Sequence, residues 1–592
     1  MLLAAERRAQ NIGTGADRVL IAADAITEEA YLRTLATWLG AAFEPLDDIS
    51  RAECPLDDRR LIQAAAAGLL PLRRGNALVW VVAPRHLTAR RLADPRRSSP
   101  RWLCPFRLTS TARLRRFVAQ HARKELGRRA SDGLRRTHPL FSNAPRGHGA
   151  RRRLALAIAL PIAMLALAPA AVAMTASAAL CAVFLAAAAL RLASGAVRRP
   201  AADRAPRLSD HELPIYTLIC ALYREAGIVG NLVAAIRALD YPPEKLDVKF
   251  VLEADDKETR RALEKLELGA PFDVIIAPAI GPRTKPKALN VALAFAHGSF
   301  TGVYDAEDVP QPDQLRRAVR AFLTNDHRLA CVQAPLTIDN TTDNWLTRMF
   351  TADYAGQFEV LMPALARLGL PLPLGGSSNH FRTAVLRQIG GWDSYNVTED
   401  ADLGMRLYRF GYYSAVLSPS PTYEEAPARF MPWLKQRTRW YKGWMQTWLV
   451  HMRRPRRLVG DLGVAGTVVF QLLFAGNVIS ALVHPLFLLG LCYALFGAPA
   501  RPIAADDAAM LWAAALLCGY VSTIAPNILG LRRGGLGAHA WALALTPLYW
   551  LLLSLAAWRA FLHLLYDPQR WEKTEHGLAR TSRLAVLDDQ ET

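Results

Sequence analysis

The sequence predicts an α/β domain with a Rossmann-like sheet, inserted between α-helical transmembrane segments and preceded by a small α+β domain. A chain of 592 residues is too long for one hydrophobic core, so several domains of roughly 100 to 200 residues are expected. Strands and helices alternate over residues 205–430, which is typical of a mostly parallel sheet. Apolar blocks long enough to cross a hydrocarbon layer about 30 Å thick lie at 154–190, 462–496, 508–530 and 537–557.

The net charge of +20 is explained by a membrane better than by a nucleic acid. Arginines flank the apolar blocks, where they favour the cytoplasmic side and anionic lipid. These clusters are Arg151 to Arg153, Arg198 and Arg199, and Arg453, Arg454, Arg456 and Arg457. We therefore expect a multi-pass protein of the bacterial inner membrane, with its N-terminal and α/β domains in the cytoplasm and no nucleic-acid partner. The seven cysteines include no C-x-x-C pair, so neither a disulfide framework nor a zinc site is indicated.

Residues 1–145 are expected to form a cytoplasmic domain. It combines a helical pattern in "ITEEAYLRTLATWLG" with a strand "ALVWVVAP" that follows the turn-forming "RRGN". Residues 154–193 are too long for one pass and predict a transmembrane hairpin that turns near Pro169.

Acidic side chains follow two predicted strands of the α/β domain. Asp255 and Asp256 end "VKFVLEADD", and "TGVYDAED" carries the second group, which is Asp305, Glu307 and Asp308. One such group alone is most simply an acidic loop or a helix N-terminus. Two groups at neighbouring strand ends repel each other unless positive charge lies between them. This pattern predicts Mg²⁺ or Mn²⁺ together with a diphosphate, although the D-x-E spacing is a weak motif by itself.

Basic and aromatic residues complete the candidate site. "RTKPKALN" places Arg283, Lys285 and Lys287 just before a helix, where they could counter phosphate charge, or could equally form an exposed basic loop. Residues 431–460 carry aromatic side chains on one helix face with cations around it, which is typical of a helix in the membrane interface. That interpretation leaves Gln436, Arg439 and Trp440 unexplained.

Four motifs in order resemble those of the processive family 2 glycosyltransferases, the cellulose synthase-like membrane polysaccharide synthases. They are Asp255-Asp256, Asp305-Ala306-Glu307-Asp308, Thr398-Glu399-Asp400 and Gln436-Arg437-Thr438-Arg439-Trp440. The resemblance covers residues 210 to 577 and implies a GT-A fold for the α/β domain. The N-terminal domain resembles those of type II secretion ATPases.

The resemblance implies a role for each motif. Asp255 and Asp256, with Lys285, Gln436 and Arg439, would bind the donor, a UDP-sugar. Asp305 and Glu307 would bind the metal; because glutamate replaces the usual second aspartate here, Asp308 is the alternative second ligand. The acceptor would be bound by Trp440 and by Ser378, Asn379, His380 and Phe381 of "GGSSNHF".

Thr398, Glu399 and Asp400 have two compatible interpretations. Thr398 is a good N-cap, and carboxylates favour the positive end of a helix, so the stretch would begin a helix in any protein. A helix terminus also tends to keep Asp400 ionised, as a general base must be. We therefore expect Asp400 to take the proton of an acceptor hydroxyl during an inverting transfer.

Residues 461–560 are expected to form the channel helices. The block 462–496 predicts either one tilted pass or, as we favour, a hairpin that breaks near Pro485. Four later passes would leave residues 561–592 in the cytoplasm. There "WEKTEHG" resembles the gating loop of cellulose synthases, with Trp571, Lys573, Thr574 and His576 as its matching residues.

The sequence therefore predicts a hexosyltransferase that polymerises a β-glucan exopolysaccharide from UDP-glucose and exports it. Three alternatives stay open: single-sugar transfer to a polyprenyl phosphate, a non-catalytic receptor or scaffold, and a transporter. Besides the donor, the growing polysaccharide and membrane lipids, cyclic di-GMP or a periplasmic export partner are candidate partners. For the N-terminal domain, protein docking is favoured over cyclic di-GMP binding.

Overall fold

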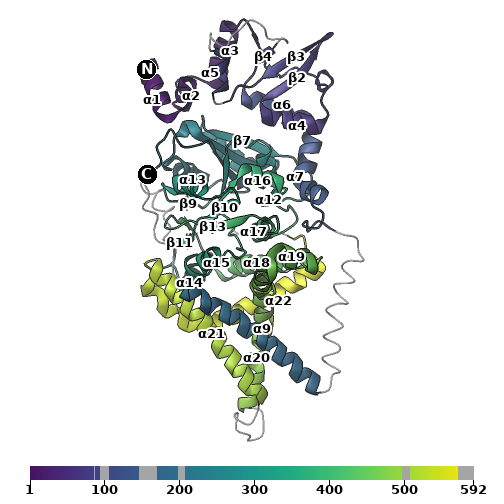
Figure 1. The fold of residues 1–592 in the computed structure, drawn as a ribbon, viewed down its shortest axis with the longest axis vertical. Helices are drawn as coiled ribbons and strands as arrows, with labels where there is room; N and C mark the ends of the chain where they lie inside the picture. Colours follow the sequence, from purple (N-terminus) through teal and green to yellow (C-terminus); the bar gives the residue numbers. More distant parts are fainter. Residues whose placement is uncertain are drawn as a thin grey trace.

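The computed structural model describes residues 1–85, 87–93, 106–145, 170–197, 207–496, 507–570 and 572. Figure 1 shows three regions stacked along the long axis of the molecule. The N-terminal domain lies at one end, the α/β domain in the middle, and the long apolar helices at the other end.

The N-terminal domain contains a four-stranded sheet in the order β1-β4-β3-β2. Gly75, at a φ of 61°, closes the hairpin between β2 and β3, and Arg74 pairs with Ala77 across it. The turn and strand expected from "RRGN" and "ALVWVVAP" are therefore present. The strands are β1 (Ala42–Phe43), β2 (Leu69–Arg74), β3 (Ala77–Val82) and β4 (Phe106–Leu108). The helices are α1 (Leu2–Ile12), α2 (Ala16–Ala22), α3 (Glu28–Trp38), η1 (Arg51–Glu53), α4 (Asp58–Ala67), α5 (Thr88–Ala93), α6 (Thr111–His121) and α7 (Arg123–Thr137).

The α/β domain is built on a seven-stranded sheet in the order β13-β10-β12-β8-β5-β6-β7. Strand β12 is antiparallel to both of its neighbours, and the other pairs are parallel. The strand order reverses at β5, which lies between β6 and β8, and ligands bind at such a switch point beyond the carboxyl ends of the strands. The strands are β5 (Tyr216–Leu222), β6 (Leu246–Glu253), β7 (Phe272–Ala277), β8 (Phe300–Tyr304), β10 (Leu329–Gln333), β12 (Asn379–Arg382) and β13 (Tyr413–Val416).

Helices cover this sheet, and apolar residues on both of its faces form the core. The helices of the α/β domain are α10 (Val229–Arg237), η2 (Pro243–Lys245), α11 (Lys257–Lys265), α12 (Lys285–Leu293), α13 (Gln314–Thr324), α14 (Trp345–Gly356), η3 (Gln357–Leu361), α15 (Met362–Arg367), α16 (Thr383–Gln388) and α17 (Glu399–Arg409). A second sheet in the order β11-β14-β9 comprises β9 (Val309–Pro310), β11 (Leu336–Ile338) and β14 (Thr422–Glu424).

Helix α18 (Phe430–His451) lies between the α/β domain and the apolar helices (Figure 1). The apolar helices are α9 (Ala170–Ala196), α19 (Pro455–Phe470), η4 (Gln471–Gly476), α20 (Asn477–Phe496), α21 (Asp507–Arg533), η6 (Gly537–Leu545) and α22 (Thr546–Tyr566). Within the described residues, four stretches are long and apolar enough to cross a membrane: 174–196, 455–496, 509–533 and 537–566. The α/β domain is therefore inserted between apolar helical segments, as expected.

The expected hairpin at Pro485 is not formed. Pro485 lies inside α20, and the stretch from Pro455 to Phe496 is one candidate span of 42 residues. A proline is tolerated within a membrane helix because neighbouring helices can satisfy the backbone group that it frees. The chain bends instead at Gly463, whose φ of 69° is outside the helical range. Three candidate spans, rather than four, follow the α/β domain in the described part of the chain.

Two other expectations fall outside the described residues. One is the first half of the hairpin predicted for 154–193, of which the structure describes α9. The other is the gating-like set Trp571, Lys573, Thr574 and His576.

Candidate active site

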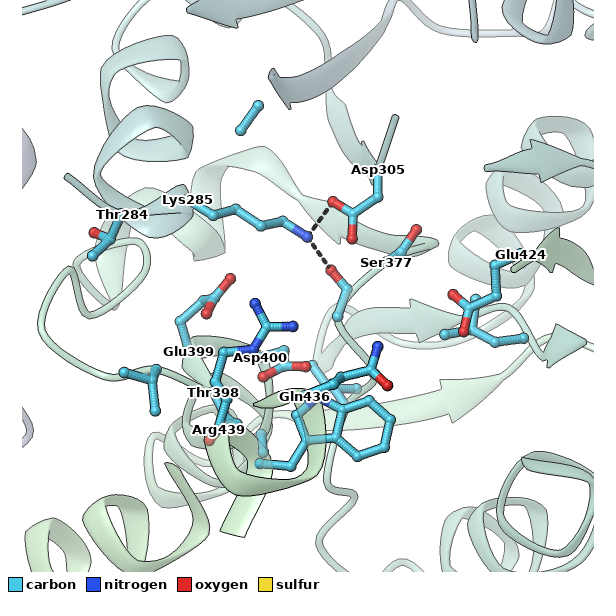
Figure 2. A pocket seen from close by; sticks show the side chains of 18 of the residues that line it. Thr284, Lys285, Asp305, Ser377, Thr398, Glu399, Asp400, Glu424, Gln436 and Arg439 are labelled. Atoms are coloured by element: carbon cyan, nitrogen blue, oxygen red, sulfur yellow. Dashed lines mark hydrogen bonds and ion pairs between the residues drawn. The ribbon is translucent and has the colours of Figure 1, made fainter. Parts of the chain in front are cut away.

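A cavity of about 660 Å³ lies at the switch point of the sheet, between the α/β domain and α18. The ends of β5 and β8 contribute Tyr223 and Asp305 to its wall. The first residues of α12 and α17 also line it, so two helix N-termini converge on one space. Figure 2 shows Lys285, Asp305, Glu399, Asp400 and Arg439 around this cavity.

Lys285 is the first residue of α12 and is held in place from two sides. Its Nζ donates to the carbonyl oxygen of Gly376 at 2.8 Å and forms an ion pair with Asp305 (Figure 2). Burial alone would lower the pKa of Lys285, but the carboxylates of Asp305 and Glu399 outweigh burial and raise it. The ammonium group therefore stays charged at the cavity wall, where it can counter a phosphate group.

The acidic loop after β8 divides into cavity-lining and supporting residues. Asp305 and Glu307 line the cavity, whereas Asp308 is fully buried. The Asp308 carboxylate accepts hydrogen bonds from the backbone N–H of Asp305, at 2.7 Å, and from the Ser377 hydroxyl. Burial is the main cause that raises the pKa of Asp308. Asp308 therefore shapes the loop from behind, and Asp305 and Glu307 are the pair that faces the cavity.

Asp305 and Glu307 fit a divalent cation by the chemistry of their donor atoms. Among the described residues, no three His, Cys, Asp or Glu side chains form a ready-made metal site. Mg²⁺ is commonly held by one or two carboxylates and completes its shell with phosphate oxygens and water. Two carboxylates on the wall of one cavity, opposite Lys285 and Arg439, match that requirement.

The predicted donor residues after β6 lie outside the cavity lining. Asp256 caps α11: its carboxylate accepts from Thr259 N at 3.2 Å and from Arg224 N at 2.5 Å. Asp255 is exposed and forms an ion pair with Arg283 at 2.7 Å, and Arg283 does line the cavity.

The residue of β6 that lines the cavity is Glu253, which belongs to none of the four sequence motifs. Its carboxylate is buried and forms an ion pair with buried Lys287 at 2.8 Å. The sequence contains a sign of this role, because Glu253 is an acidic residue that directly follows the apolar run "FVL" at the end of a predicted strand.

Glu399 and Asp400 begin α17 and line the cavity, where Glu399 is buried and Asp400 is half-buried. Thr398 occupies the N-cap position, but its hydroxyl makes no capping hydrogen bond. Burial, followed by the charge of Asp400, raises the pKa of Glu399 to about 8. Burial also raises the pKa of Asp400, although the N–H of Ala401 and the charges of Lys285 and Arg439 act in the opposite direction.

The pKa of Asp400 is raised, whereas the helix N-terminus alone was expected to favour the ionised carboxylate. The backbone N–H groups stabilise the ionised carboxylate as anticipated, but desolvation outweighs them. A carboxylate with a raised pKa binds a proton more strongly, and a general base is most effective when its pKa lies near the working pH.

Helix α18 brings Gln436, Arg439 and Trp440 to the cavity. The Gln436 side chain is 8% exposed, and its Oε1 has no hydrogen-bond partner within the described chain. The ring of Trp440 stacks on Tyr354 with 6.1 Å between centroids. Trp433 and Tyr441 are buried against protein, so α18 is packed more deeply than a helix lying on a membrane surface.

Arg437 of the same helix points away from the cavity lining and serves packing. Its guanidinium lies 4.4 Å from the ring centroid of Phe350 and 4.7 Å from that of Trp440. It also donates to the Tyr549 hydroxyl at 2.9 Å and pairs with Asp353 at 3.3 Å. Arg437 thus ties α18 to α14 and α22.

The segment "GGSSNHF" contributes only its first part to the cavity. Gly375, Gly376 and Ser377 line it, whereas the predicted acceptor residues Ser378, Asn379, His380 and Phe381 are buried in or beside β12. His380 contacts the Tyr216 hydroxyl at 2.8 Å, and burial lowers the pKa of His380 to about 3. These residues therefore stabilise the sheet, because they lie in β12 or immediately before it and their side chains are buried in the core.

The N-terminal domain supports the site from behind through α7. The carbonyl oxygen of Ala130 accepts from Asn290 Nδ2 at 2.9 Å and from the Ser394 hydroxyl at 2.7 Å. The carbonyl oxygen of Ser394 accepts from the Thr284 hydroxyl at 3.0 Å, and Thr284 immediately precedes Lys285. Asn143 N donates to Asp393 at 2.5 Å in the loop that leads to Thr398. Sequence patterns gave no sign of this contact.

Fold and site together define a glycosyltransferase domain with the GT-A fold. Residues 217–388 match the family described as glycosyl transferase family 2, and residues 303–566 match glycosyl transferase family group 2. The chain therefore carries a family 2 glycosyltransferase domain.

Its similarity to individual proteins is partial. It is 28% identical over 241 residues to a beta-monoglucosyldiacylglycerol synthase of Synechocystis, covering 40% of this chain and 50% of that one. It is 24% identical over 243 residues to glucomannan 4-beta-mannosyltransferase 2 of Arabidopsis thaliana, covering 40% of this chain and 45% of the relative. The chain thus spans about half the length of these relatives. Among solved structures, the mannosyltransferase PcManGT of Pyrobaculum calidifontis, in complex with GDP-Man and Mn²⁺, has a TM-score of 0.42 at 20% identity and covers 66% of this chain and 99% of its own.

Proposed function

We propose that the chain is a processive, inverting hexosyltransferase that polymerises a β-glucan from UDP-glucose at the cytoplasmic face of the bacterial inner membrane. The growing polymer would leave between the chain's own apolar helices. The observation that carries this proposal is that the site cavity adjoins a second cavity among those helices.

The second cavity has a volume of about 170 Å³ and is lined by residues of α9, α14, α18, α20, α21 and α22. Gln357, Trp440, Trp444 and Asn477 line both cavities. The second wall also carries the polar side chains of Ser480, His484, Ser522 and Asn527. Polar groups between apolar helices form hydrogen bonds within the protein, as His484 does with the Tyr520 hydroxyl at 2.9 Å, or line a path for a polar substrate. A polymer rich in hydroxyl groups is such a substrate.

On the donor side, Lys285 and Arg439 would contact the diphosphate. Arg283 with Asp255, and Glu253, would face the nucleoside end. Asp305 and Glu307 would hold Mg²⁺ or Mn²⁺, which would neutralise charge on the departing UDP. Asp256 and Asp308 would act by fixing the backbone that carries these groups.

On the acceptor side, Asp400 would be the general base. An acceptor hydroxyl oxygen forms the new bond to the anomeric carbon as the bond from that carbon to UDP breaks, and the hydroxyl proton passes to Asp400. Displacement from the opposite side converts an α-linked donor into a β linkage. Gly376 keeps the approach to Asp400 open, since even a Cβ at this position would lie 3.4 Å from Asp400 Oδ2. Trp440 would stack on the acceptor sugar.

A second candidate function is the transfer of a single sugar to a lipid acceptor, including a polyprenyl phosphate. The observation that favours it is the similarity to a synthase named for a glucosylated lipid. For the N-terminal domain we propose a role in docking another protein, and binding of cyclic di-GMP stays a prediction.

Product length distinguishes the two functions. Inner-membrane vesicles that contain the protein are incubated with radiolabelled UDP-glucose and Mg²⁺ or Mn²⁺, and the products are separated by size. Polymer that resists lipid extraction and is degraded by a β-glucanase supports the proposal. Label found only in a lipid-extractable monosaccharide product would replace it with the second candidate.

A further inference from the structure

Beyond the four motifs, Glu424 and Glu425 also line the site cavity. Glu424 ends β14, which pairs antiparallel with β9 and parallel with β11. Because β9 directly follows the Asp305–Asp308 loop, Glu424 is attached through main-chain hydrogen bonds to the loop of the predicted metal ligands.

The backbone around Glu424 is also fixed on its other side. The carbonyl oxygen of Glu424 accepts from Asp339 N at 3.1 Å. Asn340 holds Ala426 twice, by accepting from Ala426 N at 2.9 Å and donating to Ala426 O at 2.9 Å. A side chain presented from such a segment has a defined position, which a binding group requires.

The side chains near Glu424 suit a sugar. Its carboxylate forms a hydrogen bond with the hydroxyl of Tyr354, and the ring of Tyr354 is stacked on that of Trp440 at an interplanar angle of 26°. Gln436 lies one helical turn before Trp440 on α18, lines the same cavity, and has a buried Oε1 without a hydrogen-bond partner in the described chain. A buried polar atom left unpaired costs free energy, so a hydrogen-bond donor on a ligand would stabilise this oxygen.

We propose that Glu424, Tyr354 and Gln436 form a subsite that binds the hydroxyl groups of an acceptor sugar lying on Trp440. The inference rests on the proposed function and deepens it by naming the class of acceptor. Figure 2 shows Glu424 and Asp400 on different sides of the cavity with Gln436 between them. Sugar hydroxyls donate to carboxylate and amide oxygens, and aromatic rings pack against the apolar face of a sugar ring.

The negative charge around Glu424 and Glu425 favours a neutral acceptor. Glu424 and Glu425 line the same cavity as Asp400, and an anionic acceptor would meet these three carboxylates. The cations that line this cavity are Arg283, Lys285 and Arg439, and all three belong to the donor side of the proposed site. Of these, Arg283 is paired with Asp255 and Lys285 with Asp305. An uncharged oligosaccharide end is therefore preferred to a lipid phosphate. By fixing the rotation of the terminal sugar, the subsite also decides which hydroxyl faces Asp400, and hence the linkage.

The test separates acceptor binding from donor binding. Full-length protein in lipid nanodiscs is assayed for UDP release from UDP-glucose, with cellotetraose or laminaritetraose added as a soluble primer. We expect Glu424→Gln and Tyr354→Phe each to raise the primer KM about tenfold, the size expected for a lost charge-assisted hydrogen bond, while the donor KM changes less than twofold. Glu258→Gln, an exposed carboxylate of α11 outside the cavity, is the matched control and should change neither value.

UDP affinity measured by calorimetry shows whether each variant keeps its folded donor site. Unchanged primer KM values in both variants, with wild-type UDP affinity, would overturn the subsite and leave the proposed function standing. A donor KM that rises as much as the primer KM would overturn it too, because Glu424 would then serve the donor. If the wild type transfers glucose to neither primer nor endogenous polymer, the proposed function itself fails, and the inference fails with it.

Discussion

Replacing Gly443 by alanine tests how closely α18 must approach the proposed base. A Cβ at position 443 would lie 2.2 Å from Thr398 Oγ1, 2.4 Å from its Cγ2 and 2.7 Å from its Cβ. Ordinary contacts begin near 3.4 Å, so helix and loop must separate by about 1 Å, and the atoms of Thr398 belong to a short, buried side chain. Since Thr398 immediately precedes Glu399 and Asp400, the displacement reaches the base directly.

A misplacement of about 1 Å can reduce a rate by about 100-fold. We therefore expect Gly443→Ala to lower kcat for UDP-glucose-dependent polymer synthesis by roughly that factor, with a much smaller change in UDP affinity. Gly230→Ala in α10 is the matched control, because a Cβ there has no heavy atom within 4 Å. Synthesis would be measured in membranes at equal protein levels, and UDP affinity by calorimetry. A wild-type kcat for Gly443→Ala would refute the argument that this contact positions the base.

Two further predictions concern charge in the cavity. Because the pKa of Glu399 is raised to about 8, this group is mainly protonated at pH 7 and loses its proton as the pH rises through 8. Glu399→Gln copies the protonated form, so it should keep the rate at pH 7 within about threefold of the wild-type rate. It should also remove the change in rate that we expect of the wild type between pH 7 and 9. A loss of about 100-fold at pH 7 would mean that the ionised form of Glu399 is required. Asp305→Ala should abolish the dependence of UDP affinity on Mg²⁺ or Mn²⁺, measured by calorimetry. The control Asn325→Ala, at an exposed residue, should keep that dependence. Metal-dependent UDP binding by Asp305→Ala would count against Asp305 as a metal ligand.

Much of the fold could be predicted because its signals are local. The alternation of strands and helices predicted the α/β domain over residues 205–430, and "RRGN" predicted the turn that precedes β3. The acidic and basic motifs were found because the ends of parallel strands meet at one edge of the sheet. Lys285, Asp305, Glu399, Asp400 and Arg439 do line one cavity.

Features that depend on tertiary packing could not be predicted in this way. Asp256 and Asp308 are residue types that bind donors and metals, but their carboxylates accept hydrogen bonds from backbone N–H groups instead. The sequence does not show which aspartates of a motif bind a ligand and which hold the backbone. The family resemblance placed Ser378 to Phe381 at the acceptor site, whereas Asn379, His380 and Phe381 lie in β12, which runs antiparallel inside the sheet. A proline inside a helix of a soluble protein usually indicates a break, but the chain remains helical at Pro485. The contact of α7 with Asn290 and Ser394 joins residues more than 100 positions apart and leaves no periodic signal.

Asp400 is the group proposed to accept the proton of the acceptor hydroxyl, and every other role in the site depends on that step. The decisive measurement is the initial rate of glucose incorporation from radiolabelled UDP-glucose by Asp400→Asn and wild-type protein in membranes, with UDP affinity measured in parallel. Because asparagine keeps the shape of the side chain but cannot take up a proton, we expect a loss of about 100-fold or more in rate with nearly unchanged UDP affinity. Equal incorporation by the variant and the wild type would contradict the central claim.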